Sequence, residues 1–320
     1  MTTSPVVDYL FNDFNDVKQR QHYIGGSDIA KVMGLSRWGT PLSLWAEKTG
    51  KIPAKDLSNV EAVEIGTDLE QFVADMFTKR TGKTVRKAPK TYQHPDYPYM
   101  VAHIDRLVTG SDELLECKTC SFFKGEEWKE DEIPQEYILQ VMWYLGITGR
   151  KIGHIAVLIG GQKFVTKPIE FDQELFDQMV ESAKEFWMCV INDTPPAVMS
   201  ADDETLASLY HDHSEQFIEL EPIDDKSTEA VDDFENAIAR LQAIKGEIKD
   251  LEDEKKTIET SIKDLIKEHL GILTPQYRVT WKQQTVPRLD TTRFKLERPD
   301  TYQDYLVSNT FRVLRVTKNK

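Results

Sequence analysis

Residues 101–120 read VAHIDRLVTGSDELLECKTC, which is the pattern of two strands joined by a tight turn. Both flanks are rich in Val, Ile and Leu, and the Thr-Gly-Ser-Asp between them is typical of a hairpin turn. We expect that turn to centre near residues 110–111. Antiparallel pairing about it places Asp105 roughly opposite Glu116, with both side chains on one face of the sheet.

Two facing carboxylates point to a bound cation. Like charges repel strongly at this separation, and a divalent ion such as Mg²⁺ or Mn²⁺, which prefers oxygen ligands, relieves the repulsion. Lys118 follows Glu116 by two residues and therefore shares its face of the strand. An ammonium group there could hold and polarise a water molecule beside the cation and oppose negative charge on a phosphoryl group.

A surface hairpin that carries an ordinary Glu–Lys pair is the alternative, because exposed cross-strand charges are common. Leu114 and Leu115 argue against it. Two consecutive apolar residues indicate a strand covered on both faces, where charged groups need partners. The hairpin alone leaves both interpretations open.

Two amphipathic helices add further polar groups. The helix expected over residues 61–81 carries Glu70 on its inward stripe, where a third carboxylate would suit a second metal ion or an outer ligand. A half-exposed Glu at the edge of the apolar face is equally compatible with this position. The helix expected over residues 134–149 carries Gln140 at the centre of a stripe. Its amide could hydrogen-bond a water molecule or a phosphate, or it could simply border an amphipathic helix.

The order of the predicted elements is that of an α/β domain. It runs helix, three strands, helix, two strands and a helix over residues 172–193, after which a Pro-Pro pair marks a boundary. We expect an α/β domain over residues 1–197 and an acidic linker over residues 198–227. The third part, residues 228–320, is expected to begin with a long helix and to end in a small α+β segment.

Charge is unevenly distributed along the chain, whose formal net charge is −14. Residues 201–272 contain 21 acidic and 8 basic residues, whereas residues 273–320 contain 4 acidic and 10 basic residues. This balance excludes a protein that coats nucleic acid through a broad basic surface, but it leaves room for DNA binding in one channel.

Three features of the composition concern the cellular compartment. The sequence has no run of about 18 apolar residues, and its first residues show no basic start followed by an apolar stretch. Its three cysteines cannot form a disulfide framework. We therefore expect a cytoplasmic protein, in the host cytoplasm if a phage encodes it, with no membrane partner.

The motifs follow one another in the order of the PD-(D/E)xK nuclease core. Glu70 on a helix precedes Asp105-x10-Glu116-x-Lys118 on a hairpin, and Gln140 follows on the next helix. Three longer blocks narrow the resemblance, and they are IGGSDI at 24–29, SRWGTPLSLWAEKTG at 36–50 and IGTDLE at 65–70. Together these motifs resemble the YqaJ-like viral recombinase family, whose members are relatives of lambda exonuclease.

The resemblance covers about residues 18–197 and implies both a fold and a metal site. The implied fold is α/β, a restriction-endonuclease-like PD-(D/E)xK core with a central mixed sheet flanked by helices. The implied ligands of Mg²⁺, for which Mn²⁺ could substitute, are Asp105, Glu116 and the main-chain carbonyl of Cys117. Glu70 would serve the same metal site.

The resemblance also implies roles for residues around the metal. Lys118 would position the attacking water, while Gln140 and Tyr137 would support that water or the scissile phosphate. In the family, an Arg and a Ser at the spacing of Arg20 and Ser27 bind the 5′-phosphate of a DNA end. These nine positions form the predicted site.

The activity implied by the resemblance is digestion of linear duplex DNA from 5′ ends, which leaves 3′ single-stranded tails for phage-type recombination. The implied partners are double-stranded DNA ends, a single-strand annealing protein and further copies of the chain in a ring. One departure from the family pattern is Arg106, which stands where many relatives have Gly and could alter the approach to DNA.

Two other functions remain open at this point. A structure- or single-strand-specific DNA endonuclease could use the same core, and it would differ by cutting closed circular DNA. A non-catalytic DNA-end-binding protein could keep the fold without the chemistry. The presence of the acids, the Lys and the Gln together argues against this second alternative.

Overall fold

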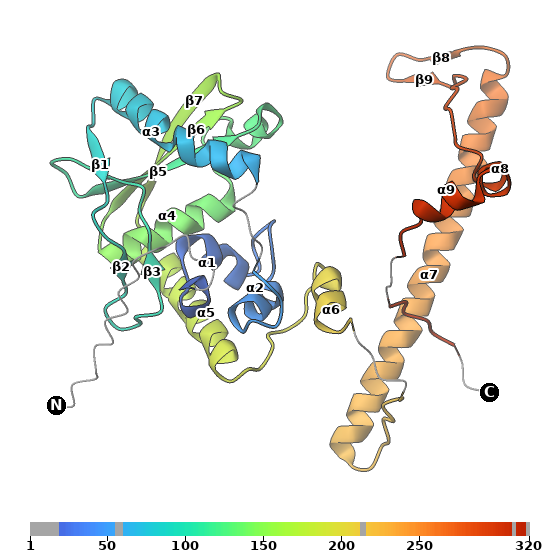
Figure 1. The fold of residues 1–320 in the computed structure, drawn as a ribbon, viewed down its shortest axis with the longest axis horizontal. Helices are drawn as coiled ribbons and strands as arrows, with labels where there is room; N and C mark the ends of the chain where they lie inside the picture. The colour runs from blue at the N-terminus through green and yellow to red at the C-terminus, as the bar shows by residue number, and fades with distance from the viewer. Residues whose placement is uncertain (1–18, 55–59, 212–215, 309–311, 318–320) are drawn as a thin grey trace. The chain divides into compact units, whose positions relative to one another are not determined.

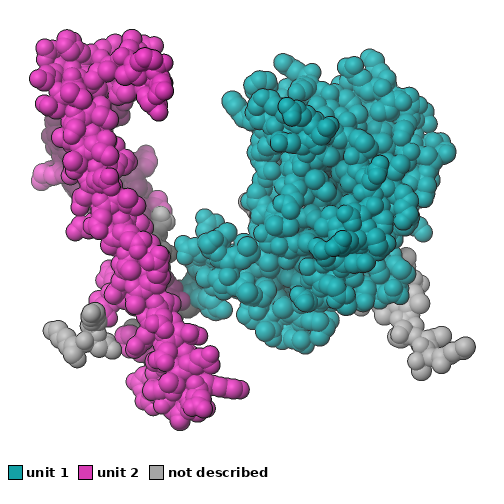
Figure 2. Space-filling model, turned by 180° about the vertical axis from the view of Figure 1, so that it is seen from behind, with its two compact units in different colours: residues 1–211 teal, residues 212–320 magenta. Residues whose placement is uncertain are grey.

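The computed structural model describes residues 19–54, 60–211, 216–308 and 312–317. The chain divides into two compact units, Met1–His211 and Asp212–Lys320, which Figure 2 shows in different colours. The first unit contains every residue of the predicted site.

A five-stranded mixed sheet forms the centre of the first unit, as the α/β prediction requires. Its strands, in spatial order, are β1 (Val85–Lys87), β4 (Arg106–Val108), β5 (Glu113–Cys120), β6 (Ile152–Ile159) and β7 (Lys163–Glu170). Only the β5–β6 pair is parallel. Parallel neighbours need a long crossover, and here the 3₁₀ segment η2 (Phe122–Trp128) and helix α4 (Gln135–Thr148) supply it.

Helices α3 (Glu61–Thr81) and α4 cover opposite faces of this sheet (Figure 1). Leu115 packs with Val73 and Phe77 of α3, whereas Leu114 packs in the larger cluster that contains Trp143 of α4. The expectation that this strand is covered on both faces is therefore confirmed. Successive residues of a strand point to opposite faces, so α3 and α4 each meet alternate side chains of β5.

The expected helices form where the apolar periodicity places them. Helix α3 spans the expected residues and ends at Gly82, whose φ of 75° is the left-handed conformation that glycine adopts without strain. Three further helices, α1 (Gly26–Val32), α2 (Pro41–Lys48) and α5 (Gln173–Ile191), join α4 in the larger apolar cluster. A short 3₁₀ segment, η1 (Gln19–His22), precedes α1.

The first arm of the predicted hairpin is shorter than expected. β3 (Val101–Ala102) pairs with β2 (Tyr92–Gln93) in a separate two-stranded sheet, and β4 begins only at Arg106. The Trp143 indole donates a hydrogen bond of 2.9 Å to the Val101 carbonyl and so ties this strand to α4. The prediction of one continuous strand up to residue 108 is therefore wrong. Its first half pairs with β2 and contacts α4 instead.

The first unit extends beyond residue 197, the boundary expected from the Pro-Pro pair. Helix α6 (Asp203–Leu209) packs against α2, and the fully buried Asp202 accepts a hydrogen bond from the Thr40 hydroxyl. The first part of the expected acidic linker, residues 198–227, thus belongs to the folded unit. The acidic composition predicted a linker, but Asp202 is buried in the folded unit with a hydroxyl partner.

The second unit contains the expected long helix and small α+β segment. Helix α7 spans Asp225–Ile266, and it is followed by β8 (Gly271–Leu273), β9 (Arg278–Thr280), α8 (Thr291–Glu297) and α9 (Pro299–Asp304). The Asp224 carboxylate accepts the Ser227 amide at 2.8 Å and caps the start of α7. In the described part of the chain, no helix is long and apolar enough to cross a membrane.

Candidate active site

One cavity of about 510 Å³ in the first unit brings most of the predicted site together. The predicted residues that line it are Arg20, Ser27, Asp105, Glu116 and Gln140. They come from η1, α1, the bend before β4, the middle of β5, and α4. Segments that are far apart in the sequence therefore converge on the face of β5 that α4 covers.

The hairpin register places Asp105 opposite Glu116, as expected. β4 pairs with β5 through Arg106 opposite Leu115, so the residue before β4 continues the pairing to Glu116. Opposed residues of an antiparallel pair point to the same face. The Asp105 carboxylate accepts the main-chain N–H of Cys117 at 2.8 Å, which holds it beside the middle of β5.

Glu116 is a buried carboxylate that uses only one of its oxygens. Its side chain is 3% exposed, and Oε1 accepts hydrogen bonds from Lys118 Nζ at 2.6 Å and from Gln140 Nε2 at 2.7 Å. Oε2 is also buried, and it meets no hydrogen-bond donor among the described residues. An unsatisfied buried carboxylate oxygen is costly, so a cation is the partner that this oxygen fits.

The electrostatics of Asp105 agree with a cation at this position. Burial, and then the negative charge of Glu116, raise the pKa of Asp105 well above its usual value, and Lys118 opposes this only partly. Two carboxylates so placed do not both ionise readily unless positive charge is added between them. Asp105 and the free oxygen of Glu116 could therefore hold one divalent cation.

Lys118 stays protonated in this environment. Burial by itself would lower the pKa of its ammonium group, but the charges of Glu116 and Asp105 outweigh burial and raise the pKa. The ammonium also lies 5.3 Å from the centre of the Tyr137 ring, which stacks on Trp128 at 5.5 Å. Lys118 is therefore a fixed positive charge that contacts Tyr137 and Glu116. Neither Lys118 nor Tyr137 lines the cavity itself.

Glu70, expected at the metal site, forms an ion pair with the residue that follows Asp105. Its carboxylate pairs with the buried guanidinium of Arg106, which also donates to the Asp105 carbonyl at 2.8 Å and to Gln71 at 3.1 Å. One nitrogen of Arg106 thus lies between Glu70 and the Asp105 main chain, and the charge of Glu70 is the smallest of the causes that raise the pKa of Asp105. Among the described residues, no group of three or more His, Cys, Asp and Glu side chains is placed to hold a metal.

Strand alternation explains the position of Glu70. Arg106 pairs with Leu115 and so points to the α3 face, whereas Asp105 pairs with Glu116 on the α4 face. Glu70 lies on α3, and the first side chain it meets is Arg106. The sequence predicts that the residue after Asp105 has the opposite orientation, but it does not predict which face of the sheet α3 covers.

Gly26 allows the wall that carries Ser27 to approach α4. A Cβ atom at Gly26 would lie 2.4 Å from the Tyr144 ring, a distance that excludes any side chain there. The Tyr144 hydroxyl in turn accepts a hydrogen bond of 2.9 Å from Gln140. Tyr144 was not predicted as a site residue, although it stands one helical turn after Gln140 and its position could have been inferred from that spacing.

The part of the chain that forms this site is similar to one known family of domains. The YqaJ-like viral recombinase domain matches residues 17–151. Protein YqaJ of Bacillus subtilis (strain 168) is 36% identical over 299 residues, which span 92% of this chain and 91% of that protein. The chain belongs to the YqaJ-like viral recombinase family. All nine predicted site residues fall inside the stretch that matches the YqaJ-like domain.

Solved structures similar to this YqaJ-like chain include two exonucleases. An alkaline exonuclease from Laribacter hongkongensis aligns with a TM-score of 0.47 and 21% identity, over 55% of this chain and 91% of that one. A phage-related exonuclease from Haemophilus somnus 129PT aligns with a TM-score of 0.42 and 14% identity, over 53% of this chain and 96% of that one.

Proposed function

We propose that the chain is a Mg²⁺-dependent exonuclease that digests linear duplex DNA from 5′ ends and leaves 3′ single-stranded tails for phage-type recombination. The observation that carries the proposal is the buried Glu116 carboxylate, which has one unsatisfied oxygen, faces Asp105 and is tied to the protonated Lys118. Membership of the YqaJ-like viral recombinase family supports it.

The residues around the unsatisfied oxygen suit a hard cation. Asp105, Glu116 and the Cys117 carbonyl would hold Mg²⁺, with Mn²⁺ as the expected substitute, because all three ligands are oxygens. Bound there, the ion would supply Lewis-acid polarisation of a phosphoryl oxygen and a lower pKa for water. With Glu70 held by Arg106, these residues suit one ion rather than two.

The chain's own side chains position the reactants. The Lys118 ammonium donates to a water molecule and opposes the charge that develops on the phosphate in the transition state. Gln140 bridges Glu116 and the Tyr144 hydroxyl, and it therefore fixes the orientation of the carboxylate. The charges of Glu116 and Asp105 raise the pKa of Lys118, so its role in the proposal is electrostatic.

The far wall of the cavity supports preference for a DNA end. Arg20 and Ser27 are both exposed, and they line the same cavity as Asp105 and Glu116. A guanidinium and a hydroxyl together bind a terminal phosphate well. A 5′-phosphate held there would bring a nearby phosphodiester to the carboxylates. A ring of copies around the DNA and a single-strand annealing protein complete the proposed assembly.

A cation bound between the carboxylates should stabilise the folded chain. We expect saturating Mg²⁺ to raise Tm, because a ligand at 100 times its Kd adds about 2.7 kcal/mol to the free energy of unfolding. Glu116→Gln should abolish most of this shift, since it removes the charge of one ligand. Thermal unfolding in Mg²⁺ and in EDTA measures this rise in Tm. The matched control is Glu126→Gln, because the Glu126 side chain is 74% exposed. Equal shifts in all three proteins would contradict the proposed cation site.

The activity itself is tested with DNA of defined ends. Linear duplex labelled at the 5′ or the 3′ terminus, and closed circles, are incubated with the protein in Mg²⁺ or EDTA. We expect loss of one strand from 5′ ends, only with Mg²⁺ and not with the Asp105→Asn variant, while circles stay intact. Cutting of circles would favour an endonuclease. Binding of DNA ends without any cleavage would contradict the proposed nuclease activity.

A further inference from the structure

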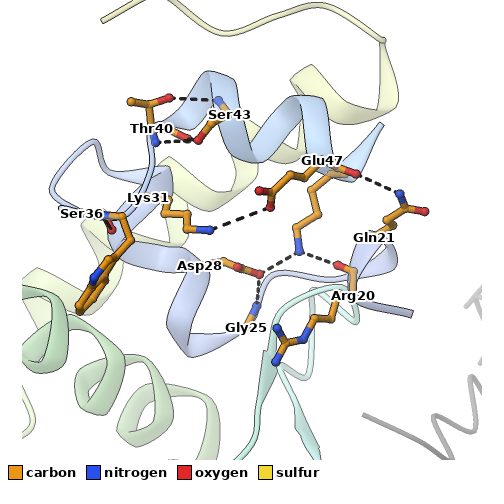
Figure 3. A network of polar contacts seen from close by, with 11 residues as sticks. Arg20, Gln21, Gly25, Asp28, Lys31, Ser36, Thr40, Ser43 and Glu47 are labelled. Atoms are coloured by element: carbon orange, nitrogen blue, oxygen red, sulfur yellow. Dashed lines mark hydrogen bonds and ion pairs between the residues drawn. The ribbon is translucent and has the colours of Figure 1, made fainter. Parts of the chain in front are cut away.

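A buried lysine lies behind the wall of the cavity that carries Arg20 and Ser27. The Lys48 side chain, at the end of α2, is only 4% exposed. Its ammonium group donates to the Arg20 carbonyl at 2.5 Å and to the Asp28 carboxylate at 2.8 Å. Figure 3 shows Arg20 and Asp28 within this network. One charged group therefore links η1 to the first turn of α1.

Both segments that Lys48 joins belong to the cavity. Arg20 and Asp28 line it together with Ser27, which directly precedes Asp28. The Asp28 carboxylate also accepts the main-chain N–H of Gly25 at 3.2 Å and so closes the turn at the start of α1. Burial alone would raise the pKa of Asp28, but Lys48 and Lys31 outweigh it and lower the pKa, which keeps the carboxylate charged.

Helix α2 acts as a common support for the two segments. The Gln21 side chain of η1 donates to the Glu47 carbonyl at 3.0 Å, and the Glu47 carboxylate lies 4.0 Å from the Lys31 ammonium of α1 (Figure 3). The Lys48 ammonium is also 5.4 Å from the centre of the Tyr23 ring. These contacts fix the backbone of η1 and of α1 to one rigid element, while the Arg20 and Ser27 side chains remain exposed.

A buried ion pair contributes little to stability by itself, because desolvation of the two charges offsets their attraction. Lys48 is better explained by what it holds in place. Its ammonium binds a main-chain carbonyl of one phosphate-facing segment and a carboxylate of the other. Loss of this link would let η1 shift relative to α1 without changing Asp105 or Glu116.

We propose that Lys48 is a positioning residue that fixes the separation of Arg20 and Ser27, and that it thereby determines the preference for DNA ends that carry a 5′-phosphate. The inference rests on the proposed function. Neither Lys48 nor Asp28 contacts the phosphate in this role. Lys48 acts through the Arg20 backbone, and Asp28 acts through the turn that presents Ser27.

The test compares kcat/KM for matched duplexes with a 5′-phosphoryl or a 5′-hydroxyl end. Displacement of a binding group by about 1 Å lowers the rate of an enzyme by up to about a hundredfold. Lys48→Met should therefore lower the ratio of the two kcat/KM values by about tenfold or more. The change should come mainly from a higher KM for the phosphorylated end. Lys51→Met is the matched control, because Lys51 is exposed and pairs at 2.9 Å with Asp193 on the surface. That control should keep the ratio of the original protein.

A second variant keeps the test valid if Lys48→Met does not fold. Lys48→Met takes the ammonium away from the largely buried Asp28 carboxylate, so Asp28→Asn is combined with Lys48→Met to remove both charges and keep the fold. Loss of the 5′-phosphate preference in the double variant supports the inference. Retention of the preference in a folded variant overturns it. If the original protein itself shows no preference, the 5′-phosphate part of the proposed function fails, and the role of Lys48 fails with it.

Discussion

Lys118→Met is expected to slow strand cleavage by about 10²–10³-fold, the usual effect of removing one preorganised group that stabilises transition-state charge. Methionine preserves an apolar stem of similar length but removes the ammonium that contacts Glu116 and lies 5.3 Å from the centre of the Tyr137 ring. The carboxylates that would bind the cation remain. Single-turnover cleavage of 5′-phosphorylated duplex in saturating Mg²⁺ measures the chemical step without product release.

The matched control for this variant is Lys124→Met, which removes an exposed lysine shortly after the same strand. It should cleave at the rate of the original protein. The Mg²⁺-dependent rise in Tm should persist in Lys118→Met, because the ligands are intact. A cleavage rate within about threefold of the original would contradict the electrostatic role of Lys118, since removal of a group that stabilises transition-state charge has a far larger effect.

Arg106→Met is expected to lower the free energy of unfolding by about 2 kcal/mol in EDTA, because it removes charge-assisted hydrogen bonds of a buried guanidinium and leaves the partly exposed Glu70 carboxylate without its partner. Arg106 is 3% exposed and contacts Glu70 and the Asp105 carbonyl. The variant frees Glu70 and loosens the main chain beside a proposed cation ligand. Urea denaturation followed by circular dichroism measures the change.

Two further variants test why Arg106→Met lowers the free energy of unfolding. Arg80→Met removes an exposed arginine from the same helix α3 and should change stability by less than about 0.5 kcal/mol. Glu70→Gln added to Arg106→Met should recover much of the loss, since the uncompensated charge is gone. If the double variant is as unstable as Arg106→Met alone, loss of the pairing with Glu70 does not explain the lower free energy of unfolding.

The hairpin and its register could be predicted because both depend on local pattern. A turn sequence between two apolar runs fixes which residues face one another, and strand alternation then places Asp105 and Glu116 on one side. Helices α3, α4 and α5 follow from periodicity and from their terminal Gly and Pro residues. The part of the site built on these elements is therefore the part that the sequence predicts well.

The remaining features depend on contacts between distant segments. Periodicity tells which side of α3 faces inward, but it does not tell which face of the sheet α3 covers, so Glu70 was expected beside Glu116. The burial of Asp202 depends on Thr40, more than 150 positions earlier in the chain. Lys48 resembles an ordinary surface lysine until η1 and α1 are seen to meet at its ammonium.

The origin of the cavity walls has a consequence for how the molecule folds. Asp105, Glu116, Lys118 and Gln140 all lie within residues 105–140, and short loops close at small cost in chain entropy. The opposite wall comes from residues 20–28, whose contacts with this stretch close a far longer loop. Contacts of high sequence separation slow folding, so the carboxylate pair can assemble early while the end-facing wall docks late. A newly synthesised chain would thus form the proposed metal-binding wall before the wall that is proposed to bind DNA ends.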